Sequence, residues 1–204
     1  MMKRLLSDIV VLLAGGCASM NESECVNADW RMIGFEDGSV GRTRGYIGEH
    51  RQACAKHDIT PDLDSYNSGH AEGVRGFCVE ANGFRFGRSG GTYSGICPYE
   101  LEEEFLIGYR RGKDLHSAEQ AVHQINAVIS DYKRQIKSAE AGLKIKEDLL
   151  VSDESTEETR RTLLDEIKDL RKKLEDLQAF LGDAEQGLVA RQTQLAALKQ
   201  SMDY

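Results

Sequence analysis

Long apolar runs and an excess of basic residues are both missing from this sequence. No stretch of about 18 or more apolar residues occurs, which excludes a multi-pass membrane protein. Lys and Arg number 26 against 34 Asp and Glu, a net charge of -8, and the basic residues do not cluster. Because an acidic chain of this kind repels phosphate, we expect no nucleic-acid partner.

Complete catalytic motifs are missing as well. No Gly-x-Ser-x-Gly element and no Cys–His pattern stands out. Asp62, Asp64 and Glu72 do not fit a calcium loop, which needs a glycine and a final glutamate that are not there. We therefore predict that the protein is not an enzyme, with no catalytic residues, no cofactor and no small-molecule substrate that the sequence identifies.

Glycine, proline and cysteine are distributed unevenly along the chain. Residues 1–114 contain 17 of the 20 glycines, both prolines and all five cysteines. Such a composition shift indicates that two different architectures are joined. We predict a signal peptide over residues 1–16, a Gly-rich disulfide-containing domain over 17–114 and a coiled-coil helical hairpin over 115–204.

The first residues have the layout of a secretory signal. Met1–Arg4 is a basic start, Ile9–Ala14 is a short apolar core, and small residues precede Cys17. The cysteine at this place resembles a bacterial lipoprotein signal, and the resemblance implies that Cys17 carries the lipid. Ala18, where Asp would resemble an inner-membrane retention signal, favours the periplasmic face of the outer membrane. The alternative is a buried N-terminal helix with Cys17 as an ordinary small hydrophobic residue.

Four cysteines remain after Cys17. An even number of cysteines in a small module that is predicted to be exported indicates disulfides. Three pairings are possible, and we favour Cys25–Cys54 and Cys78–Cys97 because they close local loops. Each bond is expected to stabilise the module by roughly 3 kcal/mol through the unfolded state.

A metal site is the competing interpretation of the same region. His50, Cys54 and His57 share one helical face, and Cys25 and His70 would complete a set of nitrogen and sulfur ligands for zinc. The spacing matches none of the usual paired-ligand patterns, and exported thiols are normally oxidised. We predict no metal, and we place His50 and His57 at exposed helix positions.

Three segments of the module contain an aromatic residue followed by two glycines four residues apart. They are Trp30–Gly38, Tyr66–Gly73 and Phe105–Gly112. Glycine costs a helix about 1 kcal/mol relative to alanine, so its repetition on one face needs a reason. Paired glycines allow another backbone to approach closely, and we predict three short helices packed through glycine faces. The alternative is three loops that contain glycine.

Prolines and turn residues mark the rest of the module. Thr60-Pro61-Asp62 and Pro98 with the acids that follow it predict helix N-termini. Asn82-Gly83 and Gly87–Gly91 are turn signals that predict a small hairpin or a long irregular loop. The segment Phe84–Tyr93 is the site of an alternative function, in which the protein binds a periplasmic ligand or the cell wall, or is an envelope enzyme.

The spacing of these glycines, aromatics and cysteines resembles a known family. The runs Trp30–Gly41, Tyr66–Cys78 and Gly83–Pro98 are similar to a family of bacterial lipoproteins catalogued as domain of unknown function family 2799. The resemblance covers about residues 25–112. It implies a location in the cell envelope and no catalysis, and the C-terminal half of the chain lies outside it.

Beyond residue 115 the sequence has a sustained heptad pattern. Apolar residues first alternate in steps of three and four through Val122, Ile125, Ile129, Tyr132, Ile136, Ala139, Leu143 and Leu150. A second run follows through Leu163, Ile167, Leu170, Leu174, Leu177, Leu181, Ala184, Leu188, Leu195 and Leu198. Lys146 and Arg191 are the two misfits. Such a pattern with charged outer positions predicts coiled-coil helices.

The two heptad runs are out of phase by three residues, and no apolar residue lies between Val151 and Leu163. We therefore predict an antiparallel hairpin with its tip near 151–156, whose second arm packs beside Gly108 and Gly112. One continuous helix with a stammer is the alternative.

These patterns together predict an all-α protein with a small disulfide-containing domain and a coiled-coil hairpin. The predicted function is that of a lipid-anchored envelope lipoprotein with a structural or scaffolding role. It would present the hairpin to envelope proteins or to a second copy of itself. A transport-assembly adaptor is a further alternative, although the β-rich halves that flank such hairpins are not indicated by the sequence.

Overall fold

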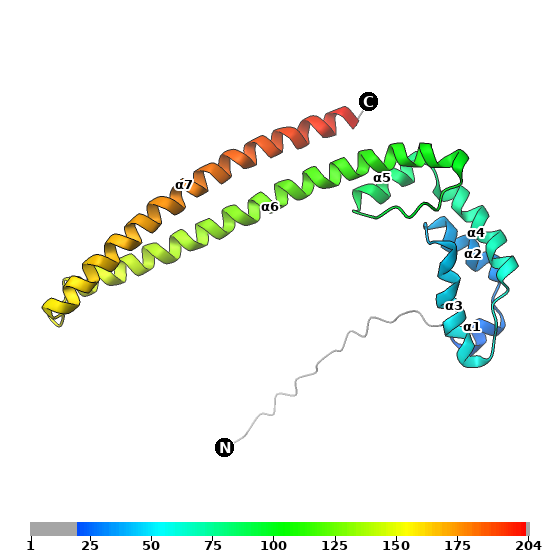
Figure 1. The fold of residues 1–204 in the computed structure, drawn as a ribbon, viewed down its shortest axis with the longest axis horizontal. Coiled ribbons are helices and arrows are strands. Elements are labelled where there is room, and N and C mark those ends of the chain that lie inside the picture. Colours follow the sequence, from blue (N-terminus) through cyan, green and yellow to red (C-terminus); the bar gives the residue numbers. More distant parts are fainter. Residues whose placement is uncertain (1–19, 203–204) are drawn as a thin grey trace, which may run out of the picture. The chain divides into compact units, whose positions relative to one another are not determined.

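The structure is a computed structural model that describes residues 20–202 of the chain. The predicted signal peptide and Cys17 lie outside the described residues. In the described part every regular element is a helix and no strand occurs (Figure 1), so the predicted all-α class is confirmed. No helix in residues 20–202 is both long and apolar enough to span a bilayer.

The chain forms two compact units. The first unit takes in the described residues up to Asn82 together with Tyr93–Phe105. The second takes in Gly83–Thr92 and the described residues from Leu106 onward. The first unit is the disulfide-containing part of the molecule, and the second contains the coiled-coil hairpin.

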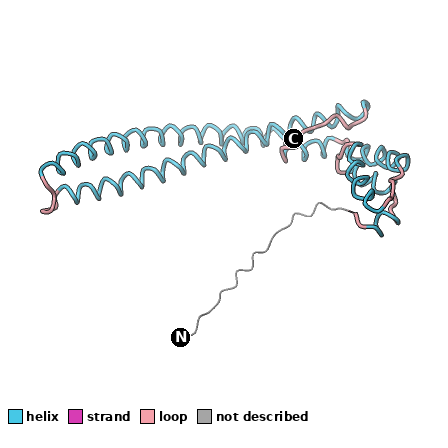
Figure 2. The backbone as a smooth tube through the Cα atoms, turned by 60° about the horizontal axis from the view of Figure 1, so that its bottom comes forward, coloured by secondary structure: helices cyan, strands magenta, loops and turns pink. Residues whose placement is uncertain are grey.

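Short helices make up most of the first unit. In chain order they are α1 (Glu22–Val26), α2 (Trp30–Ser39), the 3-10 turn η1 (Arg44–Tyr46), α3 (Ile47–Cys54), the 3-10 turn η2 (Ala55–His57) and α4 (Leu63–Phe77), seen as cyan coils in Figure 2. Side chains cap three of them, because Asn21, Asp29 and Asp62 accept hydrogen bonds from the first turns of α1, α2 and α4. Asp62 is thus the N-cap of α4, within the segment Thr60-Pro61-Asp62 that predicted a helix N-terminus.

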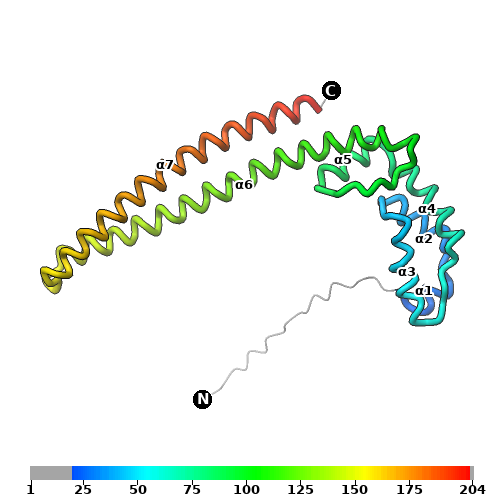
Figure 3. Tube along the Cα trace, in the orientation of Figure 1, coloured from blue at the N-terminus to red at the C-terminus, as the bar shows by residue number. Residues whose placement is uncertain are grey.

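Helices α2 and α4 pack side by side and run in the same direction (Figure 3). A Cβ built on Gly34 would overlap the Tyr66 carbonyl group, and one built on Gly38 would overlap that of His70. Gly69 and Gly73 of α4 meet the α2 backbone in the same way. The predicted packing through glycine faces is therefore found here, between two of the three segments.

Helix α5 (Glu80–Arg88) occupies the segment that was expected to be a hairpin or an irregular loop. That expectation is wrong. A Cβ built on Gly87 would overlap the carbonyl group of Tyr109, and one built on Gly112 would overlap that of Phe84. Close packing against the next helix offsets the cost of glycine inside α5. Within residues 80–93 a positive φ appears only after the helix, at Gly90 (φ +85°).

Helix α6 (Tyr99–Leu150, 52 residues) begins directly after Pro98, as predicted. Phe105–Gly112 is consequently part of a long helix and not a short helix of its own. The glycine face at Gly112 is covered by α5. Gly112 thus faces α5 and not the second arm. The second arm nevertheless returns beside this segment as predicted, because Arg111 Nη2 donates to the carbonyl oxygen of Met202 at 3.5 Å.

Helix α7 (Glu157–Met202, 46 residues) returns antiparallel to α6 and lies beside it (Figures 1 and 2). The chain reverses direction over residues 151–156, so a hairpin forms and not one continuous helix. Predicted seam residues are buried between the arms, including Ile129 (7% exposed) and Ile167 (4% exposed). The heptad pattern therefore identified the side of each helix that faces the other.

Candidate functional site

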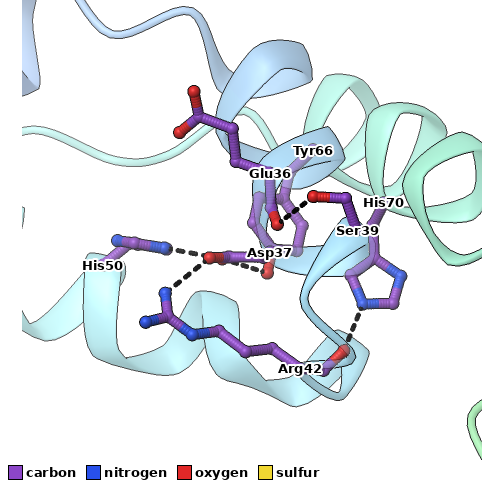
Figure 4. A network of polar contacts seen from close by, with 7 residues as sticks. All are labelled: Glu36, Asp37, Ser39, Arg42, His50, Tyr66 and His70. Atoms are coloured by element: carbon purple, nitrogen blue, oxygen red, sulfur yellow. Dashed lines mark hydrogen bonds and ion pairs between the residues drawn. The ribbon is translucent and has the colours of Figure 1, made fainter. Parts of the chain in front are cut away.

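One buried carboxylate in the first unit gathers three polar side chains (Figure 4). Asp37 of α2 is 3% exposed. Its Oδ1 accepts a hydrogen bond from Arg42 Nη1 at 2.7 Å. Its Oδ2 accepts hydrogen bonds from His50 Nε2 and from the Tyr66 hydroxyl, both at 2.8 Å. The buried charge is thus compensated by an ion pair and by two further donors.

Local backbone geometry explains why these groups meet. Gly34 and Gly38 allow α4 to approach α2, and Gly34 lies against the backbone of Tyr66. Gly41 has a φ of +82°, a conformation that favours glycine, and it reverses the chain just after α2. Arg42 then folds back, and its backbone N–H donates to the Asp37 carbonyl oxygen at 3.0 Å.

Aromatic rings surround His50 of α3. Its ring centroid lies 5.4 Å from that of Tyr46, 6.1 Å from that of Tyr66 and 6.3 Å from that of Trp30, each in an edge-on arrangement. The His50 side chain is only 16% exposed. The prediction of an exposed helix position for His50 is therefore wrong, because the Asp37 carboxylate and these rings cover it.

Two groups around Asp37 have shifted pKa values. Burial and the hydrogen bond to Asp37 raise the pKa of the Tyr66 hydroxyl far above its ordinary value. The hydrogen bond to Asp37 raises the pKa of Arg42 as well, although burial opposes this. Both groups therefore keep their protons at neutral pH. They serve as fixed donors to the carboxylate.

His70 of α4 is the second buried polar side chain next to this cluster, at 3% exposed. Its Nε2 donates to the carbonyl oxygen of Arg42 at 2.8 Å, and its ring stacks on Tyr66 with centroids 5.9 Å apart. A carbonyl oxygen can only accept, so Nε2 must carry the proton. The other ring nitrogen, Nδ1, is buried and has no hydrogen-bond partner among the described residues.

His70 forms part of the wall of a cavity of about 730 Å³ in the first unit. Arg44, Glu72, Arg75 and the segment Ser94–Pro98 also line it. Glu72 is paired with Arg31 at 2.6 Å, and Arg75 is paired with Glu100 at 2.9 Å. The exposed Arg44 therefore gives the wall its excess positive charge.

The chemistry that the Asp37 cluster can perform is limited. Asp37 orients His50 as a carboxylate orients the base of a catalytic triad. Within residues 20–202, however, no hydrogen bond joins His50 to a serine, threonine or cysteine. The cluster links α2, α3, α4 and the turn after α2, and that is the role its geometry supports.

The cysteines predicted to form disulfides are bonded in two pairs. Cys25 is joined to Cys54 and Cys78 to Cys97. The zinc alternative needed Cys25 and Cys54 as thiolates, so it loses two ligands. His57 belongs to η2 and not to α3, so it does not share a regular helical face with His50. Across residues 20–202 no group of three or more His, Cys, Asp or Glu side chains is placed to hold a metal ion.

Sequence reasoning missed the Asp37 cluster. Asp37, Arg42, His50 and Tyr66 are 5 to 29 residues apart and form no short motif. The one usable signal was the position of Asp37 beside Gly38, on a helix already predicted to pack through glycine. The Phe84–Tyr93 segment proposed as a binding loop begins inside α5, and the cavity next to His70 does not include it.

The fold and the buried cluster together describe the class of protein to which this chain belongs. It is an all-α protein with two disulfides, two glycine-faced helix pairs, a buried carboxylate cluster and a long helical hairpin. Residues 29–114 match the family model described as Protein of unknown function (DUF2799). The resemblance drawn from the glycines, aromatics and cysteines is thus confirmed, and the hairpin lies outside the match. No curated protein and no solved structure matches the chain.

Proposed function

We propose that this protein is a lipid-anchored lipoprotein of the bacterial outer membrane that faces the periplasm and presents its hairpin to partner proteins. The lipid would be attached at Cys17, as the layout of the first residues implies. Disulfides persist in oxidising compartments, so the Cys25–Cys54 and Cys78–Cys97 bonds support export from the cytosol.

The observation that carries the scaffolding role is the incompletely covered hairpin. The 46 residues of α7 correspond to about 70 Å of helix. Large apolar side chains remain exposed near the tip, with Ile145 at 60%, Val151 at 76% and Leu164 at 54%. Two helices bury only one side of each other, and further helices packed on the hairpin would cover such residues.

The disulfide-containing domain serves in this proposal as a rigid base. Its buried polar cluster is fully engaged in holding three helices together, and it has no nucleophile bonded to His50 within the described residues. We therefore propose a structural rather than a catalytic role for this domain. The flanking elements of the hairpin in residues 20–202 are helices, so the fold offers no support for a transport adaptor with β-rich halves.

Two measurements test the proposal. Mass spectrometry of the mature protein should show an acylated N-terminal Cys17, and a Cys17→Ser variant should leave the membrane fraction. An unprocessed Met1 would refute the anchor. A photo-crosslinking residue at Val151 in living cells should capture a distinct protein, whereas the same residue at the exposed Glu49 of α3 should not. Equal capture from both positions would count against the hairpin as the partner surface.

The cavity next to His70 favours a second candidate function, the binding of a small organic anion that carries hydroxyl groups. Arg44 supplies a positive charge, and His70 of the cavity wall has a buried ring nitrogen, Nδ1, that has no hydrogen-bond partner among the described residues and can accept from a hydroxyl. Calorimetric titration with D-gluconate as a probe tests this, with D-glucitol as the uncharged control. Binding that is equal for both probes, or unchanged in Arg44→Gln, would refute it.

A further inference from the structure

Helix α6 has a second face that is almost free of charge, apart from the seam it shares with α7. We call it the second stripe, and it consists of Ser117, Ala121, Gln124, Val128, Asp131, Gln135, Ser138, Gly142, Ile145 and Leu149. The steps alternate between four and three residues, so these positions form one continuous stripe along the helix, about 110° from the seam. Asp131 is its one charged residue.

The second stripe is uncovered in the single chain. Val128 is 42% exposed, Ile145 is 60% exposed and Leu149 is 49% exposed. Phe180 of α7, 53% exposed, stacks on Tyr132 on the same side of the hairpin. The opposite side is built differently, because it carries three ion pairs between the arms, Lys133–Glu185, Glu147–Arg171 and Glu119–Lys199. Three ion pairs thus connect the arms on one side. On the other side the α6 stripe itself carries a single charge, and Glu166 of α7 pairs there with Lys146 of the seam.

We propose that the second stripe is the contact surface for a second copy of this chain, with the two α6 helices antiparallel about a twofold axis near residue 133. In this register every large side chain of one copy meets a small one of the other. The pairs that show this are Leu149 with Ser117, Ile145 with Ala121, Val128 with Ser138 and Gln124 with Gly142. Antiparallel coiled coils pack in this way, because an a position of one helix faces a d position of the other. A large side chain can therefore lie opposite a small one along the whole seam.

A parallel arrangement of the two helices fits less well. It would set Ile145 against Ile145 and leave gaps where Gly142 meets Gly142. It would also set the one charge of the stripe, Asp131, against itself, which is unfavourable. The size pattern of the stripe therefore distinguishes the two directions.

Charge complementarity around the axis supports the same register. Asp131 lies opposite Gln135 of the second copy, whose amide can donate to it. In the single chain Asp131 already accepts from its own Gln135 at 2.6 Å and is paired with Arg134. Because Arg134 lies beside the axis, it can reach Asp131 of the other copy instead. The same residues can therefore exchange partners without leaving a charge unpaired.

The size of the contact sets the expected strength. Residues 117–149 correspond to about 48 Å of helix, and a helix presents a face about 10 Å wide. The contact would bury roughly 500 Å² on each copy, or about 1,000 Å² in total, the lower limit for a specific interface. The exposed Phe180 adds to this area. The dimer should accordingly dissociate on dilution.

The inference goes beyond the proposed function and does not depend on the lipid anchor. It is tested with the full chain carrying Cys17→Ala, which removes the one cysteine that is not part of the two disulfides. Sedimentation equilibrium should give a mass of twice 22.7 kDa at high concentration and a return to the monomer on dilution. Ile145→Glu should abolish the dimer. Leu164→Glu is the matched control, since Leu164 is similarly exposed (54%) but lies on the side with the ion pairs.

Disulfide trapping tests the direction of the helices. In the antiparallel register a mixture of Ser117→Cys and Leu149→Cys chains should form a crosslinked dimer under mild oxidation, whereas neither variant alone should do so. A parallel dimer would give the reverse pattern. A monomer at every concentration, a dimer that survives Ile145→Glu, or crosslinking of each variant with itself would each overturn the proposal.

Discussion

Gly73 of α4 lies directly against the backbone of Phe35 in α2. A Cβ built on Gly73 would overlap the Phe35 carbonyl oxygen and lie 2.8 Å from the backbone nitrogen of Ser39. Three residues further along the same helix, Gly76 has nothing within 4 Å of its Cβ position. The two glycines therefore do different things in one helix, although both are equally unfavourable to it.

This difference gives a paired prediction. Gly73→Ala should lower the free energy of unfolding by about 1–3 kcal/mol, because the helices cannot separate without losing their contact. Gly76→Ala should raise it by up to about 1 kcal/mol, because alanine favours the helix and meets no neighbour. Urea denaturation followed by circular dichroism measures both. Similar effects of the two substitutions would show that α2 and α4 are not closely packed.

The Asp37 carboxylate should contribute more to the free energy of unfolding than an exposed carboxylate of the same domain does. Asp37→Asn removes the charge that Arg42 and His50 face, and we expect a loss of about 2–3 kcal/mol. Asp64→Asn, at an exposed position in the first turn of α4, is the matched control and should change stability by less than about 0.5 kcal/mol. An Asp37→Asn variant as stable as the Asp64→Asn variant would contradict a compensated buried charge.

The raised pKa of Tyr66 predicts a loss of stability in alkali. Its ordinary pKa is 10.0, and the folded chain holds it higher, so above about pH 10 only the unfolded chain loses this proton readily. The stabilisation is thus complete below pH 10 and declines as the pH rises. Tyr66→Phe should unfold more easily at pH 7, by about 1 kcal/mol, but should show a shallower decline in alkali. Denaturation curves at pH 7 and pH 11 give the loss of unfolding free energy between these pH values for the original chain and for Tyr66→Phe. An equal loss in both would refute the raised pKa of Tyr66.

The heptad misfit Lys146 predicts a stabilising substitution. Lys146 occupies a seam position and pairs with Glu166 at 2.6 Å, with its side chain 30% exposed. Lys146→Leu should raise the free energy of unfolding by about 1 kcal/mol, because burial of apolar surface outweighs a partly exposed ion pair. Lys144→Leu, on the exposed side of α6, should have little effect. Thermal unfolding followed by circular dichroism measures the effect. A lower melting temperature for Lys146→Leu than for the original chain would contradict the prediction.

Helix α5 shows where local reasoning from the sequence failed. Asn82-Gly83 and Gly87–Gly91 are strong turn signals, and each glycine costs a helix about 1 kcal/mol. The segment is nevertheless helical to Arg88, because Gly87 and Gly112 bring α5 and α6 into contact along their backbones. Tertiary contact overrode propensity, and a fourth glycine-faced segment went unnoticed beside the three that were predicted.

The heptad pattern by itself determined the all-α class, the two long arms and the side of each arm that is buried. It could do so because helical periodicity and the hydrophobic effect act within short windows of sequence. Only the tertiary structure decided which glycine-faced helices pair and that Asp37, His50 and Tyr66 meet. The Asp37 contacts join residues up to 29 positions apart, and the glycine contacts join residues up to 38 positions apart, as for Arg31 and Gly69. They depend on how closely two backbones approach, and no local pattern encodes that distance.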